Sequence, residues 1–199
     1  MKIKGYILNS KNYIFQKTLL MLLIYITGIS AGAIYCTIIA SQFDDSLYSY
    51  LLNFFGKIKD ELPYLDTFKS SIFKNIRLFL ILFISSYFRL GAVSIIATVG
   101  IRGFVAGFSS GIFIKYYSVK GLLLSLSSLF SSLLFLPCFL FFASASFIMS
   151  SDRKMSDNLQ KRRYVLLAIC TLTIFCASSL IDSYITTTFM KLISPFFTN

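Results

Sequence analysis

Long apolar segments separated by short charged ones constrain the fold of this chain more than any other feature of its sequence. The first, residues 18–40, provides about the 20 apolar residues that a helix needs to cross a bilayer. Residues 75–120 have room for two more such segments, and residues 121–150 and 164–181 provide one each. The chain is therefore predicted to be all-α: a polytopic integral membrane helical bundle of about five transmembrane helices, forming a single membrane domain over residues 1–199.

The composition agrees with a membrane protein and argues against other classes. Hydrophobic residues make up 56% of the chain and charged residues 14%, whereas soluble domains have roughly 45–50% and about 25%. The net charge is +11, but the basic residues are spread between the apolar segments and form no long stripe. We therefore expect the lipid bilayer as a partner and no nucleic acid.

The charged segments predict how the helices are oriented. Residues 1–17 and 151–163 are basic, so the positive-inside rule places both in the cytoplasm. Residues 41–74 have nearly balanced charge and are expected to be extracytoplasmic. Their apolar spacing predicts an amphipathic helix, which either lies on the outer membrane surface or binds an extracytoplasmic partner. Five crossings then leave the N-terminus in the cytoplasm and the C-terminus outside.

The N-terminal apolar segment has a second interpretation. A basic start followed by an apolar run is also typical of a secretory signal, and Ala31-Gly32-Ala33 has the form of its cleavage site. The apolar run continues past this triplet, which favours a first helix that is not cleaved.

Three glycines, Gly103, Gly107 and Gly111, repeat every fourth residue within an apolar segment. On a helix this spacing places all three on one face, and a glycine face lets another helix backbone approach closely in a membrane. The expected role is packing against another helix, and part of a substrate pathway is the alternative.

The turn between the second and third crossings lies near one of two arginines, Arg89 or Arg102. If the second crossing ends near Arg89, then Arg102 lies inside the third; if it continues to about Gly100, then Arg89 lies inside the second. In either case one arginine is drawn toward the membrane, which costs roughly 2.5–3.5 kcal/mol on insertion scales. Such a residue is either functional or a structural group bonded to backbone carbonyls.

Two further residues are candidates for structural or interaction roles. Pro137 interrupts residues 121–150, which are too many for one straight crossing, so a kinked or tilted helix or two half-helices are expected there. Asp182 lies near the outer end of the last crossing. It caps a helical turn, faces water or pairs with one of the arginines.

Catalytic and metal-binding patterns are missing from the sequence. The chain has no histidine, which removes the commonest metal ligand and acid–base group. Its four cysteines all fall in apolar segments without CxxC spacing and are expected to be buried free thiols. No nucleophile-elbow or phosphate-loop motif occurs. We therefore expect a protein that is not an enzyme and that has no cofactor, no metal and no small-molecule substrate.

Three short stretches, in this order, resemble the stage II sporulation protein M family of spore-forming bacteria. Arg102-Gly103-Phe104 through Gly107-Phe108, with Lys120-Gly121 at the expected distance, is similar to its K-G-F-x-x-G-F stretch. Phe135-Leu136-Pro137-Cys138 is similar to its aromatic-aliphatic-Pro-Cys segment, and residues 180–186 resemble its closing E-S-Y-I-T-P. The layout of one helix, a short outer loop and four more helices is also that of the family.

The chain departs from the family pattern at three places. Phe130-Ser131-Ser132 stands where the family has P-Q-N, Asp182 replaces a Glu, and Thr187 stands where a Pro is common. The first departure removes a polar helix break.

The resemblance implies a membrane scaffold that anchors peptidoglycan-degrading enzymes during engulfment in endospore formation. Its partners would be cell-wall hydrolases resembling stage II sporulation proteins D and P, at the septal or engulfing membrane of the mother cell. Residues 41–74 and the glycine face are the candidate docking surfaces. A small membrane transporter or transporter subunit is the alternative, because interrupted helices and intramembrane charges are typical of transport sites.

Overall fold

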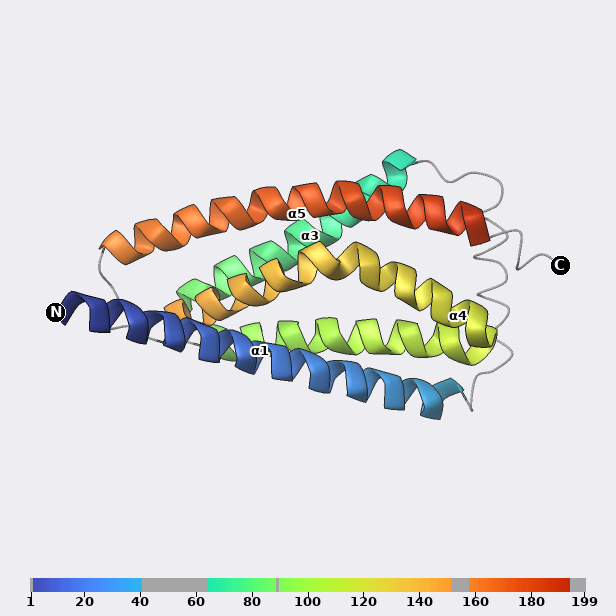
Figure 1. Cartoon of the computed structure of the whole chain (residues 1–199), viewed down its shortest axis with the longest axis horizontal. Helices are drawn as coiled ribbons and strands as arrows, with labels where there is room; N and C mark the ends of the chain where they lie inside the picture. Colours follow the sequence, from blue (N-terminus) through green and yellow to red (C-terminus); the bar gives the residue numbers. More distant parts are fainter. Residues whose placement is uncertain (1, 41–63, 89, 152–157, 194–199) are drawn as a thin grey trace.

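The computed structural model describes residues 2–40, 64–88, 90–151 and 158–193, and these ranges contain helices and no strand. The predicted amphipathic helix of the outer loop and the middle of the basic 151–163 loop lie outside the described residues. The prediction of an all-α membrane bundle is confirmed (Figure 1). Its helices are α1 (Lys2–Ala40), α3 (Tyr64–Tyr87), α4 (Gly91–Ser151) and α5 (Asn158–Ile193).

Helix α4 is a hairpin of two antiparallel arms. Its 61 residues would form a straight helix about 90 Å long, yet the hydroxyl of Ser150 donates a 2.7 Å hydrogen bond to the carbonyl oxygen of Phe88, next to its start. Figure 1 shows α4 running to the far end of the bundle and returning. Gly121 lies directly against the carbonyl group of Phe113, eight residues earlier, where a side chain would not fit. We call residues 91–115 the first arm and residues 121–151 the second arm.

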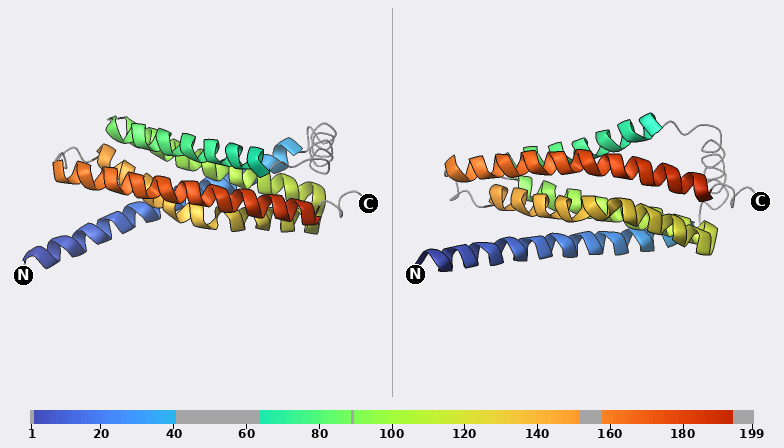
Figure 2. Two further views of the ribbon diagram at one scale, coloured as in Figure 1. Left: turned by 90° about the horizontal axis from the view of Figure 1, so that it is seen from above. Right: turned by 45° about the horizontal axis from the view of Figure 1, so that its top comes forward.

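The helices cross the bundle in alternating directions. The start of α1, the end of α3, both ends of α4 and the start of α5 lie at one end of the molecule in all views (Figures 1 and 2). The end of α1, the start of α3 and the end of α5 lie at the other end. With α4 counted as two arms, the chain makes the five passes that the apolar segments predict.

The position of the break between α3 and α4 decides between the two boundaries left open by the sequence. Helix α3 ends at Tyr87 and α4 begins at Gly91, so Arg102 lies inside the first arm and position 89 lies at the break. A side chain at Gly91 would overlap the carbonyl oxygen of Ser85, which accounts for glycine at this tight connection. The side chain of Arg89 is outside the described residues.

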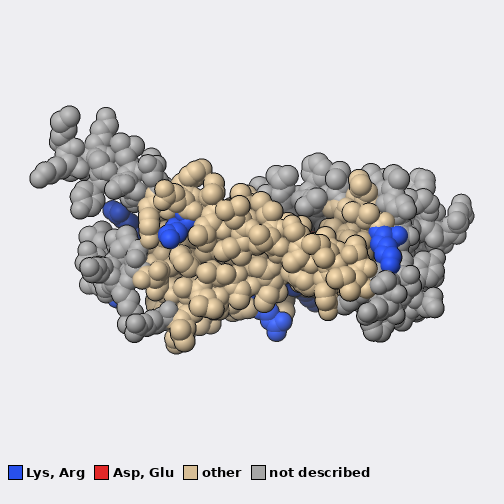
Figure 3. All heavy atoms as spheres, turned by 90° about the horizontal axis from the view of Figure 1, so that it is seen from below, with Lys and Arg blue, Asp and Glu red and all other residues tan. Residues whose placement is uncertain are grey.

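The surface of the bundle is apolar enough for a lipid environment. Three described segments are long and apolar enough to cross a bilayer: Tyr13–Ile38, Gly91–Lys115 and Lys161–Tyr184. Phe135–Ser151 is a shorter apolar helix. On the face in Figure 3 most described atoms belong to uncharged residues, with basic groups only in small separate places.

Aromatic rings fill the core where α3, the second arm and α5 meet. Phe79 of α3 stacks on Phe142 of the second arm with 5.0 Å between ring centroids, and Phe135 lies 4.6 Å from Phe175 of α5. Polar side chains join the same helices in pairs. The shortest such pair is the amide nitrogen of Asn75, which donates to the hydroxyl of Ser179 at 2.8 Å.

Candidate functional site: the glycine seam and the Arg102 cavity

The predicted glycine face packs against α1, and both helices contribute glycines to the contact. A Cβ atom on Gly103 or Gly107 would overlap the carbonyl oxygens of Tyr25 or Ile29 in α1. In return, a Cβ atom on Gly28 of α1 would lie 2.5 Å from the carbonyl oxygen of Gly100. The two backbones therefore approach as closely as glycine alone permits. We call this contact the glycine seam.

The ends of the seam are less tightly packed. At Gly111, an added Cβ atom would lie 3.0 Å from the Cβ of Cys36, and at Gly100 the nearest atom would be 3.8 Å away, which is ordinary contact. The tightest part is therefore the middle, where Gly103 and Gly107 face α1. Because α1 covers this face, it is not an open surface for a helix from another protein.

The α1 side of the seam was not singled out from the sequence, although the signal was present. Gly28 and Gly32 have the same four-residue spacing as the glycines of the first arm. A Cβ atom on Gly32 would overlap the carbonyl oxygen of Phe104. The Ala31-Gly32-Ala33 triplet, which has the form of a signal cleavage site, lies inside α1 at this contact.

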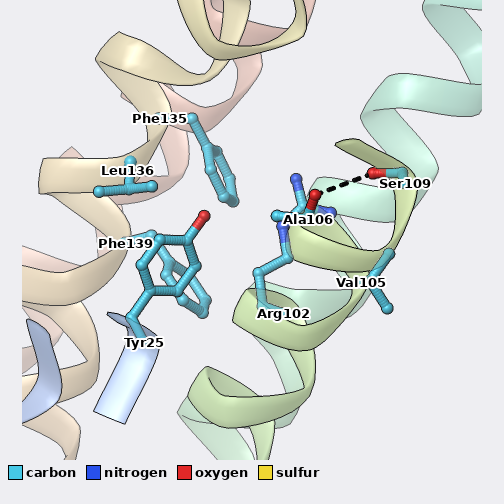
Figure 4. A pocket seen from close by; sticks show the side chains of 8 residues that line it. All are labelled: Tyr25, Arg102, Val105, Ala106, Ser109, Phe135, Leu136 and Phe139. Carbon is cyan, nitrogen blue, oxygen red and sulfur yellow. Dashed lines mark hydrogen bonds between the residues drawn. The ribbon is translucent and has the colours of Figure 1, made fainter. Parts of the chain in front are cut away.

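Arg102 lines a cavity of about 120 Å³ beside the seam. Its guanidinium carbon lies 5.4 Å from the ring centroid of Phe135 in the second arm. Figure 4 shows Tyr25 of α1 and Phe139 of the second arm on the other walls. The hydroxyl of Ser109 lines the cavity but is used within its own helix, donating to the carbonyl oxygen of Ala106 at 3.1 Å.

The position of Arg102 along the first arm places a half-buried positive charge near the middle of a candidate membrane span. Arg102 comes 11 residues after the start and 13 before the end of the candidate span Gly91–Lys115. In the part of the chain that the structure describes, its one cation–π contact is with Phe135. A ring face attracts a cation by about 0.5–2 kcal/mol, which offsets part of the cost of holding an arginine at this depth.

Pro137 lies inside the second arm, close in sequence to the cavity residues Phe135, Leu136 and Phe139. The second arm is bent along its length (Figure 1), as expected for a helix that contains proline, which removes a backbone hydrogen bond. Helix α4 nevertheless continues through this residue. The segment is therefore a bent helix rather than two half-helices.

Asp182 belongs to a separate polar contact between α3 and α5. The hydroxyl of Ser71 in α3 donates to a carboxylate oxygen of the half-buried Asp182 at 3.5 Å. The Asn75–Ser179 hydrogen bond lies one turn further along both helices. Together they form a polar strip at one end of the α3–α5 contact.

The candidate residues thus fall into two places rather than one. The glycines and Arg102 share the first arm, with Pro137 nearby on the second arm, whereas Asp182 lies between α3 and α5. Among the described residues, no three His, Cys, Asp or Glu side chains come together as a metal site would require. The four cysteines are free thiols, as predicted, but the prediction that all are buried is wrong: Cys36 alone of the four is buried, and Cys170 is exposed on the surface of the bundle.

Comparison with known proteins identifies the family to which this bundle belongs. The sequence model of a family described as Stage II sporulation protein M matches residues 12–187. The chain belongs to the stage II sporulation protein M family. No curated protein and no solved structure matches it. In this member of the stage II sporulation protein M family, the matched range contains the glycine seam, the Arg102 cavity and the α3–α5 polar strip.

Proposed function

We propose that this protein is a non-enzymatic membrane scaffold that assembles and localises peptidoglycan-degrading enzymes during engulfment in endospore formation. The observation that carries the proposal is the family match over residues 12–187. The stage II sporulation protein M family is not known as a catalytic family. A compact helical bundle that crosses a membrane also has the form of an anchor.

The physical role of such a scaffold is to raise the local concentration of its partners. Two enzymes tethered to one anchor meet each other and the cell wall at a far higher effective concentration than free enzymes do. The partners would be hydrolases resembling stage II sporulation proteins D and P, held at the septal or engulfing membrane. The N-terminus would be cytoplasmic, and the end of α5 would face the enzymes.

The docking surface that we propose for the partners is the extracytoplasmic loop rather than the glycine face. The glycine face is covered by α1, so it is not proposed as a docking surface. The remaining candidate is the extracytoplasmic loop, of which residues 41–63 lie outside the described residues.

Affinity purification from sporulating cells tests this proposal. The tagged protein is isolated in mild detergent, the eluate is identified by mass spectrometry, and its activity is measured on a peptidoglycan zymogram. We expect lytic partners in this eluate and no activity in the protein expressed alone. As a control, residues 41–63 are replaced by a Gly-Ser linker of equal length, which should release the partners. Absence of any hydrolase after gentle cross-linking would reject the scaffold.

A transporter is the second candidate, and Arg102 is the observation that favours it. A cation near the middle of a span beside a cavity is typical of a transport pathway. The cavity of about 120 Å³ is smaller than the roughly 300–1,000 Å³ of small-molecule sites. Uptake assays in proteoliposomes distinguish the two functions. Solute flux that is lost on substitution of Arg102 would favour a transporter over a scaffold.

A further inference from the structure

A second, larger hollow lies on the side of the bundle where α1 and α5 diverge. Helix α1 packs on α4, and α5 packs on α3 and α4, so α1 and α5 face each other across the second arm (Figure 1). The groove between them has a volume of about 720 Å³. Its walls include Phe15 and Leu22 of α1 and Leu167 and Ile174 of α5, and its floor includes Pro137 of the second arm.

The chemistry of this groove fits a hydrocarbon chain better than a protein helix. The two threonines in its lining already have partners in the protein. The hydroxyl of Thr18 donates to the carbonyl oxygen of Ile14 and lies 3.0 Å from the hydroxyl of Ser144 in the second arm, and the hydroxyl of Thr171 donates to the carbonyl oxygen of Ala168. The rest of the wall is mainly large aliphatic and aromatic side chains. Helices that pack in membranes prefer small residues at the contact, as in the glycine seam, whereas large apolar side chains match lipid tails.

A positive charge lies at one end of the groove. Arg163 is exposed and precedes Leu167, Cys170 and Ile174 by four, seven and eleven residues, so all four share one face of α5. Arg163 is the third residue of the candidate span Lys161–Tyr184, where a long basic side chain reaches the headgroup region.

We propose that this groove binds one acyl chain of an anionic glycerophospholipid, whose phosphate is held by Arg163. The apolar groove and the basic end match the two parts of such a lipid, because basic residues at the ends of membrane helices attract anionic headgroups. A zwitterionic lipid with the same chains fills the groove and carries the same phosphate, but its ammonium group cancels the net negative charge of the headgroup, so Arg163 attracts it less. The site is independent of the scaffold proposed above, since it needs no protein partner.

The absence of tryptophan in this chain makes a direct test possible. Cys170→Trp places a single fluorophore in the groove, and Ile169→Trp places one at the same depth on the exposed face outside it. Each full-length variant is reconstituted in mixed bilayers of phosphatidylglycerol and phosphatidylcholine, and the acyl chains of one lipid or the other are brominated to quench the fluorescence. Circular dichroism and thermal unfolding check that both variants fold.

The expected result is a lipid preference at one tryptophan only. Brominated phosphatidylglycerol should quench the groove tryptophan with an apparent affinity about fivefold above that of brominated phosphatidylcholine, the effect of one basic residue near a headgroup. The control tryptophan should be quenched equally by both. Arg163→Gln should abolish the preference, whereas Arg162→Gln, on another face of α5, should keep most of it.

Three outcomes would overturn the proposal. Equal quenching of the groove tryptophan by both lipids would show that Arg163 does not select an anionic headgroup. The same preference at both tryptophans would show a diffuse surface effect rather than a groove. Protection of the groove tryptophan from both lipids would show that protein, such as a second copy of the chain, covers the groove.

Discussion

At several glycine positions of the glycine seam, one added carbon atom decides whether two helices can pack as closely as they do. At Gly107 that atom would overlap the carbonyl oxygen of Ile29 in α1, whereas at Gly100 the nearest atom would be 3.8 Å away. Both residues lie on the same arm and face the same neighbour. They therefore form a matched pair for measuring what the close approach contributes.

We expect Gly107→Ala to destabilise the bundle by about 1–3 kcal/mol, since overpacking forces the backbones apart. Gly100→Ala should be neutral or stabilising, because alanine is the better helix former by about 1 kcal/mol. Unfolding of both variants in detergent micelles, followed by circular dichroism against a denaturant series, measures the difference. Equal stability of the two variants would show that the seam tolerates a side chain.

Arg102 allows a prediction that separates stability from function. Its charge has Phe135 as its one cation–π contact among the described residues. Arg102 is half-buried, so an apolar side chain at this position removes the cost of holding a charge near the middle of the span. We expect Arg102→Met to leave the free energy of unfolding unchanged or to raise it by up to about 3 kcal/mol, as insertion scales suggest. A large loss of stability would mean that the guanidinium holds the bundle together. Retained stability with lost partner binding would assign Arg102 a functional role.

At the scale of helices, the glycine seam and the polar pairs are two kinds of contact that add to the aromatic core, and they lie in different places. The seam joins α1 to the first arm through backbone contact, whereas polar pairs join α3 to α5 and the second arm to its neighbours. The Asn75–Ser179 pair is fully buried at 2.8 Å. Such bonds in membranes contribute on average about 0.6 kcal/mol, because the unfolded helices also find partners in the bilayer.

A double-mutant cycle on Asn75→Ala and Ser179→Ala measures that contribution. We expect a coupling energy of about 0.6 kcal/mol and no more than about 1.7 kcal/mol. The unfolding of the two single variants and the double variant in the same detergent gives the value. Additive effects would show that the hydrogen bond adds nothing beyond packing.

The features of the helices that could be predicted from the sequence are those that depend on residues close together in the chain. The apolar segments predict five passes, and Lys120-Gly121 falls at the reversal of α4. The choice between Arg89 and Arg102 could not be made, because both positions carry the same charge cost. It is decided by a tight turn around Gly91. Likewise, the contact of Ser71 with Asp182 joins residues 111 positions apart and leaves no local pattern.

At the scale of the whole molecule, the alternating helix directions place the start of α1 and the start of α5 at the same end. The basic residues 1–17 and 161–163 lie at or near these two ends, which is the arrangement the positive-inside rule favours for the cytoplasmic side. If all five passes cross the membrane, the two termini are expected on opposite sides, with the N-terminus in the cytoplasm.

Reporter fusions test this topology. A fluorescent protein that folds only in the cytoplasm should be bright when fused before residue 1 and dark when fused after residue 199. Alkaline phosphatase, which is active only outside the cytoplasm, should show the reverse. Both reporters active at the same terminus, or the opposite pattern, would reject five passes with a cytoplasmic N-terminus.

The glycine seam also has a consequence for how the chain is made. Gly32 and Gly103 are separated by 71 residues, and at about 5–20 residues per second the ribosome needs about 4–14 s to synthesise them. During that interval the arm that will cover the glycines of α1 does not yet exist. A chain that stalls before the first arm therefore lacks the partner that covers the backbone at Gly28 and Gly32 in the finished bundle.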